Sequence, residues 1–177
     1  MSNFSFLENR WDDLAKLGEF AEKYVYSDPN ASMIKQGMLC ETMVQYMLAY
    51  DGIKEPEYDN THANRIRLLK RADLLPREID NSLYILRKKR NDATHSGADD
   101  RDTALNNLKL LYEVCVWFMQ IYGDYDYVPT EYNMPEDVSV SVKELEKENA
   151  QLKEREHKLL VEIENIQKIG AENAERR

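Results

Sequence analysis

Apolar side chains recur at every third or fourth position along most of the first 123 residues, and few architectures can bury such a pattern. One such run consists of Leu105, Leu108, Tyr112, Cys115 and Met119. This spacing places the apolar residues on one face of an α-helix. The alternation typical of strands is nearly absent, and the chain has only 6 glycines and 5 prolines. The sequence therefore predicts an all-α fold, a compact bundle of four long helices and one short helix.

Changes in this pattern divide the chain into three regions. Residues 1–123 should form the bundle, with a first helix over about residues 5–25. Residues 124–140 are acidic, rich in tyrosine and interrupted by two prolines, so we expect a linker that packs on the bundle. Residues 141–177 should form a long coiled-coil-like helix that is truncated within the element.

The stretch Leu86–His95 places four cationic residues, an asparagine and a histidine within ten positions of an acidic protein. On the predicted helix, Arg90 falls in the middle of the apolar face. An arginine there needs acceptors, because it cannot lose its proton. Glu41 lies at the centre of an apolar-leaning stripe on another predicted helix. We interpret Glu41 and Arg90 as a buried structural ion pair that Arg87 can share.

The same stretch allows a chemical interpretation. Arg90, Asn91 and His95 have the form R-N-x-x-x-H, which resembles the signature of HEPN-superfamily helical domains. The resemblance implies a metal-independent endoribonuclease in which arginine and histidine act on phosphate and on the RNA 2′-hydroxyl across a dimer interface. Regular helix geometry favours the ion pair, because residues five apart diverge by about 140°. On this reasoning no catalytic residue is favoured, and the ribonuclease stays an alternative.

The charge of the chain is unevenly distributed. Its net charge of −9 argues against a general polyanion binder. Between Arg65 and Arg90, however, nine basic residues stand against three acidic ones. A solvated basic face is one interpretation of such a run. The other is a surface that contacts nucleic acid or a partner protein, and its candidate residues are Arg65, Arg67, Lys70, Arg71, Arg87, Lys88 and Lys89.

Cysteines and histidines show no metal-binding spacing. Cys40 and Cys115 both lie in apolar surroundings and are predicted to be small buried side chains in a reducing, cytoplasmic compartment. None of the 3 histidines has a second ligand at the spacing that metals require, so we assign no metal. The N-terminus lacks a signal sequence, and no apolar run is long enough to cross a membrane.

A heptad pattern runs through the last predicted helix. Leucine and isoleucine occupy most d positions, and Asn149 at an a position is typical of parallel two-stranded coiled coils. Glu156 at another a position weakens the pattern. A two-stranded coiled coil and a lone helix that packs on other sequence both stay open. The predicted seam consists of Val142, Leu145, Asn149, Leu152, Leu159, Ile163 and Ile166.

Several separated segments occur together in one order and carry a wider resemblance. They are NFSFL, YVYSDPNASMIKQGMLCE, LRKKRNDATH and VCVWFMQIYGDYDY, followed by the heptads. Over residues 3 to about 135, the chain resembles the N-terminal helical, HEPN-like domain of the restriction (R) subunit of bacterial type I restriction-modification enzymes. The residues that sit where this family pattern expects them are Ile34, Lys35, Glu41, Leu86, Arg87, Asn91, Ala93 and His95.

This resemblance implies a parent enzyme for phage defence, a type I site-specific deoxyribonuclease that uses ATP and Mg²⁺ to translocate and cut DNA. The chain contains no G-x-x-x-x-G-K-[ST] phosphate loop, so we expect no cofactor in this fragment. The expected function is an accessory domain, non-catalytic by itself, that contacts DNA or other subunits. Its expected partners are the modification and specificity subunits, DNA, and a second copy through the C-terminal helix, with no membrane.

Overall fold

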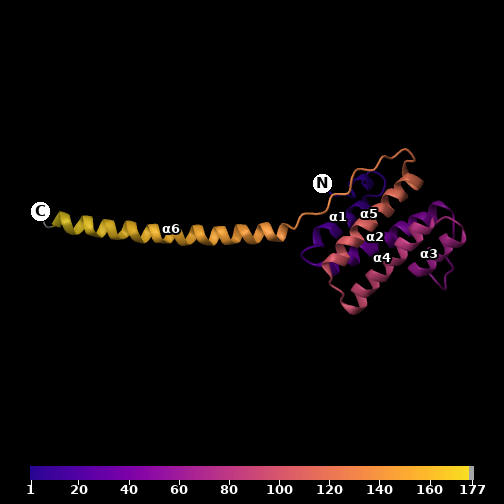
Figure 1. Ribbon diagram of the computed structural model, residues 1–177, viewed down its shortest axis with the longest axis horizontal. Helices are drawn as coiled ribbons and strands as arrows, with labels where there is room; N and C mark the ends of the chain where they lie inside the picture. Colours follow the sequence, from indigo (N-terminus) through magenta and orange to yellow (C-terminus); the bar gives the residue numbers. More distant parts are fainter. Residues whose placement is uncertain (176–177) are drawn as a thin grey trace. The chain divides into compact units, whose positions relative to one another are not determined.

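The computed structural model describes the backbone of residues 1–175 and the side chains of residues 1–137 and 145–164 (Figure 1). It divides into two units, Met1–Glu136 and Asp137–Arg177, which we describe separately. Within the described residues, all regular secondary structure is helical. The all-α prediction is therefore confirmed.

The first unit is a bundle whose helices agree in number with the sequence pattern. Its α-helices are α1 (Asp12–Tyr24), α2 (Pro29–Tyr50), α3 (His62–Arg71), α4 (Arg77–Ser96) and α5 (Arg101–Phe118). A 3₁₀ turn, η1 (Ser5–Leu7), precedes α1, and a π-helical turn, η2 (Met119–Gly123), continues α5. The short helix of the bundle is α3, which packs against α2 and α4 (Figure 1).

Helix α2 is the centre of the bundle, because it contacts α1, α3, α4 and α5. Its buried residues lie on several sides of the helix, as expected for a helix that other helices surround. Met33, Met43 and Met47 fill the core and are at most 2% exposed, whereas Met38 is 39% exposed. The stripe that contains Met38 and Glu41 is therefore at the edge of the core and not inside it.

Side chains fix the ends of three helices. Asp28, Thr61 and Asp100 each accept a hydrogen bond from the backbone N–H three residues later, at the starts of α2, α3 and α5. Helix α4 ends at Gly97, whose φ of 64° is the left-handed conformation that glycine adopts readily. These caps set the lengths of the helices and of the loops between them.

The start of the first helix differs from the sequence prediction. Helix α1 begins at Asp12 and not near residue 5, because the preceding segment folds into the core. Phe4 and Leu7 are fully buried, and Trp11 is 2% exposed. A Cβ at Gly18 would lie only 2.3 Å from Cγ of Phe4, so the Phe4 ring needs a glycine on α1 to pack there.

The segment after η2 is extended and lies on the bundle. The Tyr112 hydroxyl donates to the carbonyl of Thr130 at 2.5 Å. The side chain of Asn3 exchanges hydrogen bonds with the backbone of Asn133, at 2.7 and 2.8 Å. The Tyr127 ring stacks on Phe6 with centroids 5.1 Å apart. These contacts tie the segment to the N-terminal residues of the chain.

The second unit consists of one helix, α6 (Val138–Glu175). It begins three residues before residue 141, where the heptad pattern predicts the start of the helix. Among the described residues, no helix combines the length and the apolar character needed to cross a membrane.

Candidate functional site

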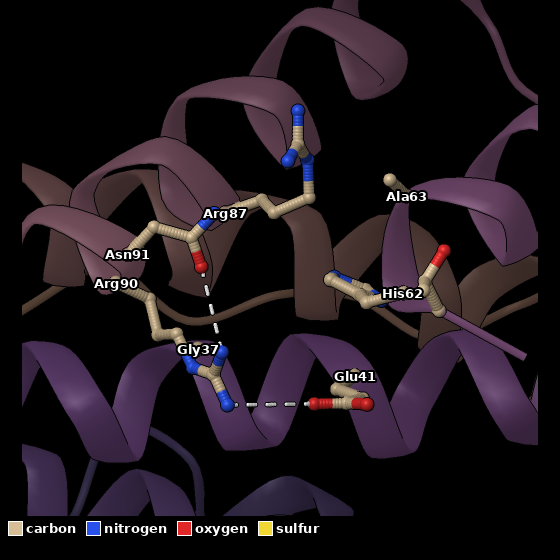
Figure 2. Close-up of a pocket in the computed structure, with 8 residues that line it drawn as sticks. Gly37, Glu41, His62, Ala63, Arg87, Arg90 and Asn91 are labelled. Carbon is tan, nitrogen blue, oxygen red and sulfur yellow. Dashed lines mark hydrogen bonds and ion pairs between the residues drawn. The ribbon is translucent and has the colours of Figure 1, made fainter. Parts of the chain in front are cut away.

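A polar pocket of about 290 Å³ lies where α2, the N-terminus of α3 and α4 meet (Figure 2). We call it the α2–α3–α4 pocket. Its lining includes Gly37, Glu41, Thr61, His62, Ala63, Arg87, Arg90 and Asn91. Two arginines, a histidine and a carboxylate thus share one small space.

Gly37 brings α4 close enough to α2 for this pocket to form. A Cβ at Gly37 would lie 2.1 Å from Cγ and 2.5 Å from Cβ of Arg90. The aliphatic part of Arg90 therefore lies directly on the backbone of α2, and its guanidinium group extends toward Glu41 (Figure 2). The packing of these aliphatic carbons explains how an arginine can occupy a position on the apolar face of α4.

The predicted ion pair between Glu41 and Arg90 is present but is neither buried nor the closest contact. Nη2 of Arg90 lies 3.8 Å from Oε2 of Glu41, and the two side chains are about one third exposed. The closer partner is Arg65, whose Nη1 donates to Oε1 of Glu41 at 2.9 Å. Arg65 also donates through Nε to Glu55 at 2.7 Å and is only 12% exposed. The prediction of a buried pair was therefore wrong, and so was the assignment of Arg87 to it, because its guanidinium group stacks on Tyr84.

His62 is the pocket residue that sequence reasoning missed as a functional candidate. Neither of its ring nitrogens, both buried, has a hydrogen-bond partner among the described residues. Burial, followed in size by the positive charges of Arg87, Arg65 and Arg90, lowers the pKa of His62 to about 4. The imidazole is therefore neutral at physiological pH.

A second groove, of about 210 Å³, continues from the pocket between α3 and α4. Ala63 and Arg87 line both spaces, and Arg67, Lys70, Asp80 and Tyr84 line the groove further along. We call this surface the α3–α4 groove. Lys70 is paired with Asp80, while Arg67 is exposed and held by Asn64 at 3.1 Å.

The predicted basic surface is only partly available as a contact surface. Arg65 is mostly buried and neutralised by two carboxylates, and Lys70 is paired with Asp80. Arg65 is thus held inside the edge of the bundle, whereas Lys70 stays exposed at the surface although it is paired. Arg67, Arg71 and Lys88 are exposed, whereas Arg87 and Lys89 are partly buried. The excess of positive charge in this part of the sequence thus overstates the charge that a partner would meet.

The residues of the R-N-x-x-x-H motif do not meet in one pocket. Arg90 and Asn91 line the α2–α3–α4 pocket and Nη1 of Arg90 lies 3.4 Å from Oδ1 of Asn91. His95 is exposed near the end of α4 and is not part of that lining. The histidine that lines the α2–α3–α4 pocket together with Arg90 is His62.

Helix α6 leaves its apolar stripe exposed within its own unit. Leu145, Leu152, Leu159 and Ile163 are between 49% and 58% exposed, and Asn149 is exposed as well. The side chains of Val142 and Ile166, the other predicted seam positions, lie outside the described residues. Among the described residues, no group of three or more histidine, cysteine or acidic side chains could hold a metal ion.

The chain is similar to one curated protein with a known role, the type I restriction enzyme EcoKI endonuclease subunit of Escherichia coli (strain K12). The two are 28% identical over 136 residues. The chain is therefore similar to part of a restriction endonuclease subunit. The match covers 76% of this chain but 11% of the relative, so the chain spans a small part of that subunit's length. No family model and no solved structure matches the chain.

Replacing Glu41 with alanine should lower the free energy of unfolding by about 1–2 kcal/mol, because Arg65 loses one charged hydrogen bond in a partly exposed site and keeps Glu55. Urea denaturation of the full chain measures this loss. The control is Lys16→Ala, which removes the exposed pair of Lys16 with Asp12 and should change the free energy of unfolding much less than Glu41→Ala does. A loss of about 4 kcal/mol for Glu41→Ala, typical of a broken buried pair, would contradict this account.

Proposed function

We propose that this chain is a non-catalytic interaction module of a type I restriction endonuclease subunit and that its α3–α4 groove contacts the phosphate backbone of DNA. The observation that carries the proposal is the similarity to the EcoKI endonuclease subunit over three quarters of the chain. The segments that resemble the R-subunit N-terminal domain lie along the same part of the chain and agree with this similarity. A helical bundle without a phosphate-loop motif suits a module that positions or contacts other parts.

The charge of the α3–α4 groove supports DNA as the partner of this surface. Arg67 and Arg87 line the groove together, and Arg71 is exposed one turn after Arg67 on α3. Guanidinium groups make paired hydrogen bonds to phosphate oxygens and hold their charge at any physiological pH. Such contacts supply affinity and orientation without reading sequence, which fits a module that leaves site recognition to another subunit.

The remaining parts of the proposal follow from the same relation. In the parent enzyme, ATP and Mg²⁺ would be bound by other domains, and the modification and specificity subunits would be partners. The apolar stripe of α6 would pack against a matching heptad helix, in a second copy of this chain or elsewhere in the complex.

Double-stranded DNA should bind the full chain, and the affinity should fall steeply with salt. With about four phosphate contacts, the loss between roughly 50 and 200 mM salt should be on the order of 100-fold, because each contact releases counterions. Fluorescence anisotropy of a labelled duplex measures this. Reversing two groove-side charges, with Arg67→Glu and Arg71→Glu together, should weaken binding at least about tenfold at low salt.

The matched control reverses two exposed charges elsewhere, with Lys23→Glu on α1 and Lys109→Glu on α5. Both double variants change the net charge equally, so equal losses would show that only overall charge matters and would overturn the groove assignment. The non-catalytic assignment is tested by incubating the chain with single-stranded RNA. Cleavage that is absent from a His95→Ala variant would overturn it in favour of the ribonuclease alternative.

A further inference from the structure

Positive charge exceeds negative charge around the α2–α3–α4 pocket. The guanidinium groups of Arg65, Arg87 and Arg90 surround His62, whereas the paired carboxylates belong to Glu41 and Glu55. Arg65 holds both carboxylates at hydrogen-bond distance, so its charge is compensated. In the described part of the chain, no carboxylate is paired with Arg87, which has only a contact to the Tyr84 ring at 5.7 Å.

Hydrogen-bonding groups that have no partner in the described part of the chain lie on a residue that lines the same space. The two ring nitrogens of His62 are buried and bond to no described residue. A neutral imidazole has one N–H donor and one acceptor nitrogen, and buried groups of this kind normally have partners. His62 and Ala63 also begin α3, and the first backbone N–H groups of a helix have no acceptor within it. These donors come from a different element than the arginines, which lie on α4.

We propose that the α2–α3–α4 pocket binds one phosphate group between Arg87, Arg90 and His62. Figure 2 shows the His62 ring, in that view, between the upward-pointing Arg87 and the Arg90–Glu41 contact below. The space of about 290 Å³ is enough for a phosphate group and part of what it is attached to. The start of α3 adds a positive helix end, which favours anions.

Glu41 does not prevent this binding. One of its oxygens accepts from Arg65 at 2.9 Å, so much of its charge is already used. Its distance of 3.8 Å to Arg90 exceeds a hydrogen bond, so Arg90 keeps N–H groups for a second acceptor. A phosphate would therefore add a further acceptor for Arg90, beside Asn91 and Glu41, and a charged acceptor for Arg87, without breaking the Arg65 pairs.

The test is a titration of the full chain with inorganic phosphate, followed by NMR of the histidine rings and compared with sodium chloride at equal ionic strength. We expect phosphate to shift the His62 resonances, assigned with His62→Gln, and to raise the pKa of His62 from about 4. The rise is expected because a bound anion favours the imidazolium form over the neutral ring. The other charges near this ring belong to Arg65 on α3, to Arg87 and Arg90 on α4, to Glu41 on α2 and to Glu55 in the preceding loop, and both carboxylates are paired with Arg65.

Arg87→Ala should weaken phosphate binding at least about tenfold, because a bidentate charged contact is lost. Arg87→Lys, which keeps the charge without the planar fork, should weaken it less, and Lys88→Ala, on an exposed neighbour, should leave it unchanged. No response of His62 to phosphate, an equal response to acetate, or unchanged binding in Arg87→Ala would each overturn the proposal. Circular dichroism of each variant shows that it is folded.

The source of the phosphate is distinguished by two further probes. Displacement of inorganic phosphate by an oligonucleotide without terminal phosphates indicates the nucleic-acid backbone, and displacement only by a nucleoside monophosphate indicates a free nucleotide. The phosphate-site inference rests on the proposed function only if the phosphate belongs to the nucleic-acid backbone. Loss of DNA binding in the Arg67→Glu, Arg71→Glu variant with an intact His62 response would refute the groove and leave the pocket. Loss of the response with DNA binding intact would refute the pocket alone.

Discussion

Replacing Phe4 with alanine should lower the free energy of unfolding of the bundle by about 3–5 kcal/mol, the usual cost of removing a buried phenylalanine ring. The ring is fully buried, meets Tyr112 edge-on at 6.3 Å and lies against the α1 backbone at Gly18. Because glycine has no side chain that could move into the space, α1 can fill the resulting cavity only by shifting as a whole. The expected result is a cavity that stays largely open.

Tryptophan fluorescence during urea denaturation measures this loss for the bundle alone, because both tryptophans lie in the first unit. The matched control is Phe20→Ala, which removes the same ring from the surface of α1, where it is 43% exposed. This control should cost less than about 1 kcal/mol, as is usual for surface positions. Similar losses for the two variants would mean that the N-terminal segment does not contribute to the core as described.

The spacing of apolar residues was sufficient to predict the number and approximate extent of the helices, because every long helix of the bundle buries apolar residues at helical spacing, α2 on several sides. It could not locate the start of α1. Phe4, Leu7 and Trp11 follow the helical period closely, yet the first two belong to a separate segment that folds under the bundle. The break before α1 allows Phe4 to pack closely on Gly18. Such a contact between two positions far apart in the sequence does not alter the spacing of apolar residues, so it could not be predicted from that spacing.

The candidate site was predictable in part, because charged residues on apolar helix faces stand out in the sequence. A charge on an apolar face indicates that Glu41 and Arg90 need partners, and the two do lie within 3.8 Å. The sequence could not show that Arg65 is the closer partner of Glu41. That contact depends on where the loop over residues 51–61 places α3 relative to α2. Glu55 of this loop also pairs with Arg65. Sequence counting therefore assigned Arg65 to the surface.

His62 illustrates a second limit. A single histidine near a predicted helix start carries no metal spacing and no motif, so it gave no signal by itself. Its interest comes from its surroundings, since buried ring nitrogens without partners and three nearby guanidinium groups are properties of the folded chain. The useful sequence signal was the cluster of basic residues on α4, because two of them, Arg87 and Arg90, line the pocket.

Replacing Gly37 with alanine should destabilise the bundle by about 1–3 kcal/mol, the usual range for an overpacked site. The direction of this effect is the informative part. Helix propensity alone predicts that glycine to alanine within a helix stabilises by about 1 kcal/mol. The new methyl group would, however, lie 2.1 Å from Cγ of Arg90, and this atom belongs to the stiff base of the side chain. Helix α4 must then move away from α2, which opens the α2–α3–α4 pocket.

A double-mutant cycle with Arg90→Ala isolates this contact. Arg90→Ala removes the closest atom but keeps its Cβ, which would lie 2.5 Å from the new methyl group, so it should relieve the clash only in part. We expect a coupling of at least about 0.5 kcal/mol between the two changes, measured by urea denaturation. In the same Gly37→Ala variant, the NMR response of His62 to phosphate should be lost, since the movement of α4 takes Arg87 and Arg90 away from His62. A stabilised Gly37→Ala protein with a normal response would mean that α2 and α4 are not packed through Arg90.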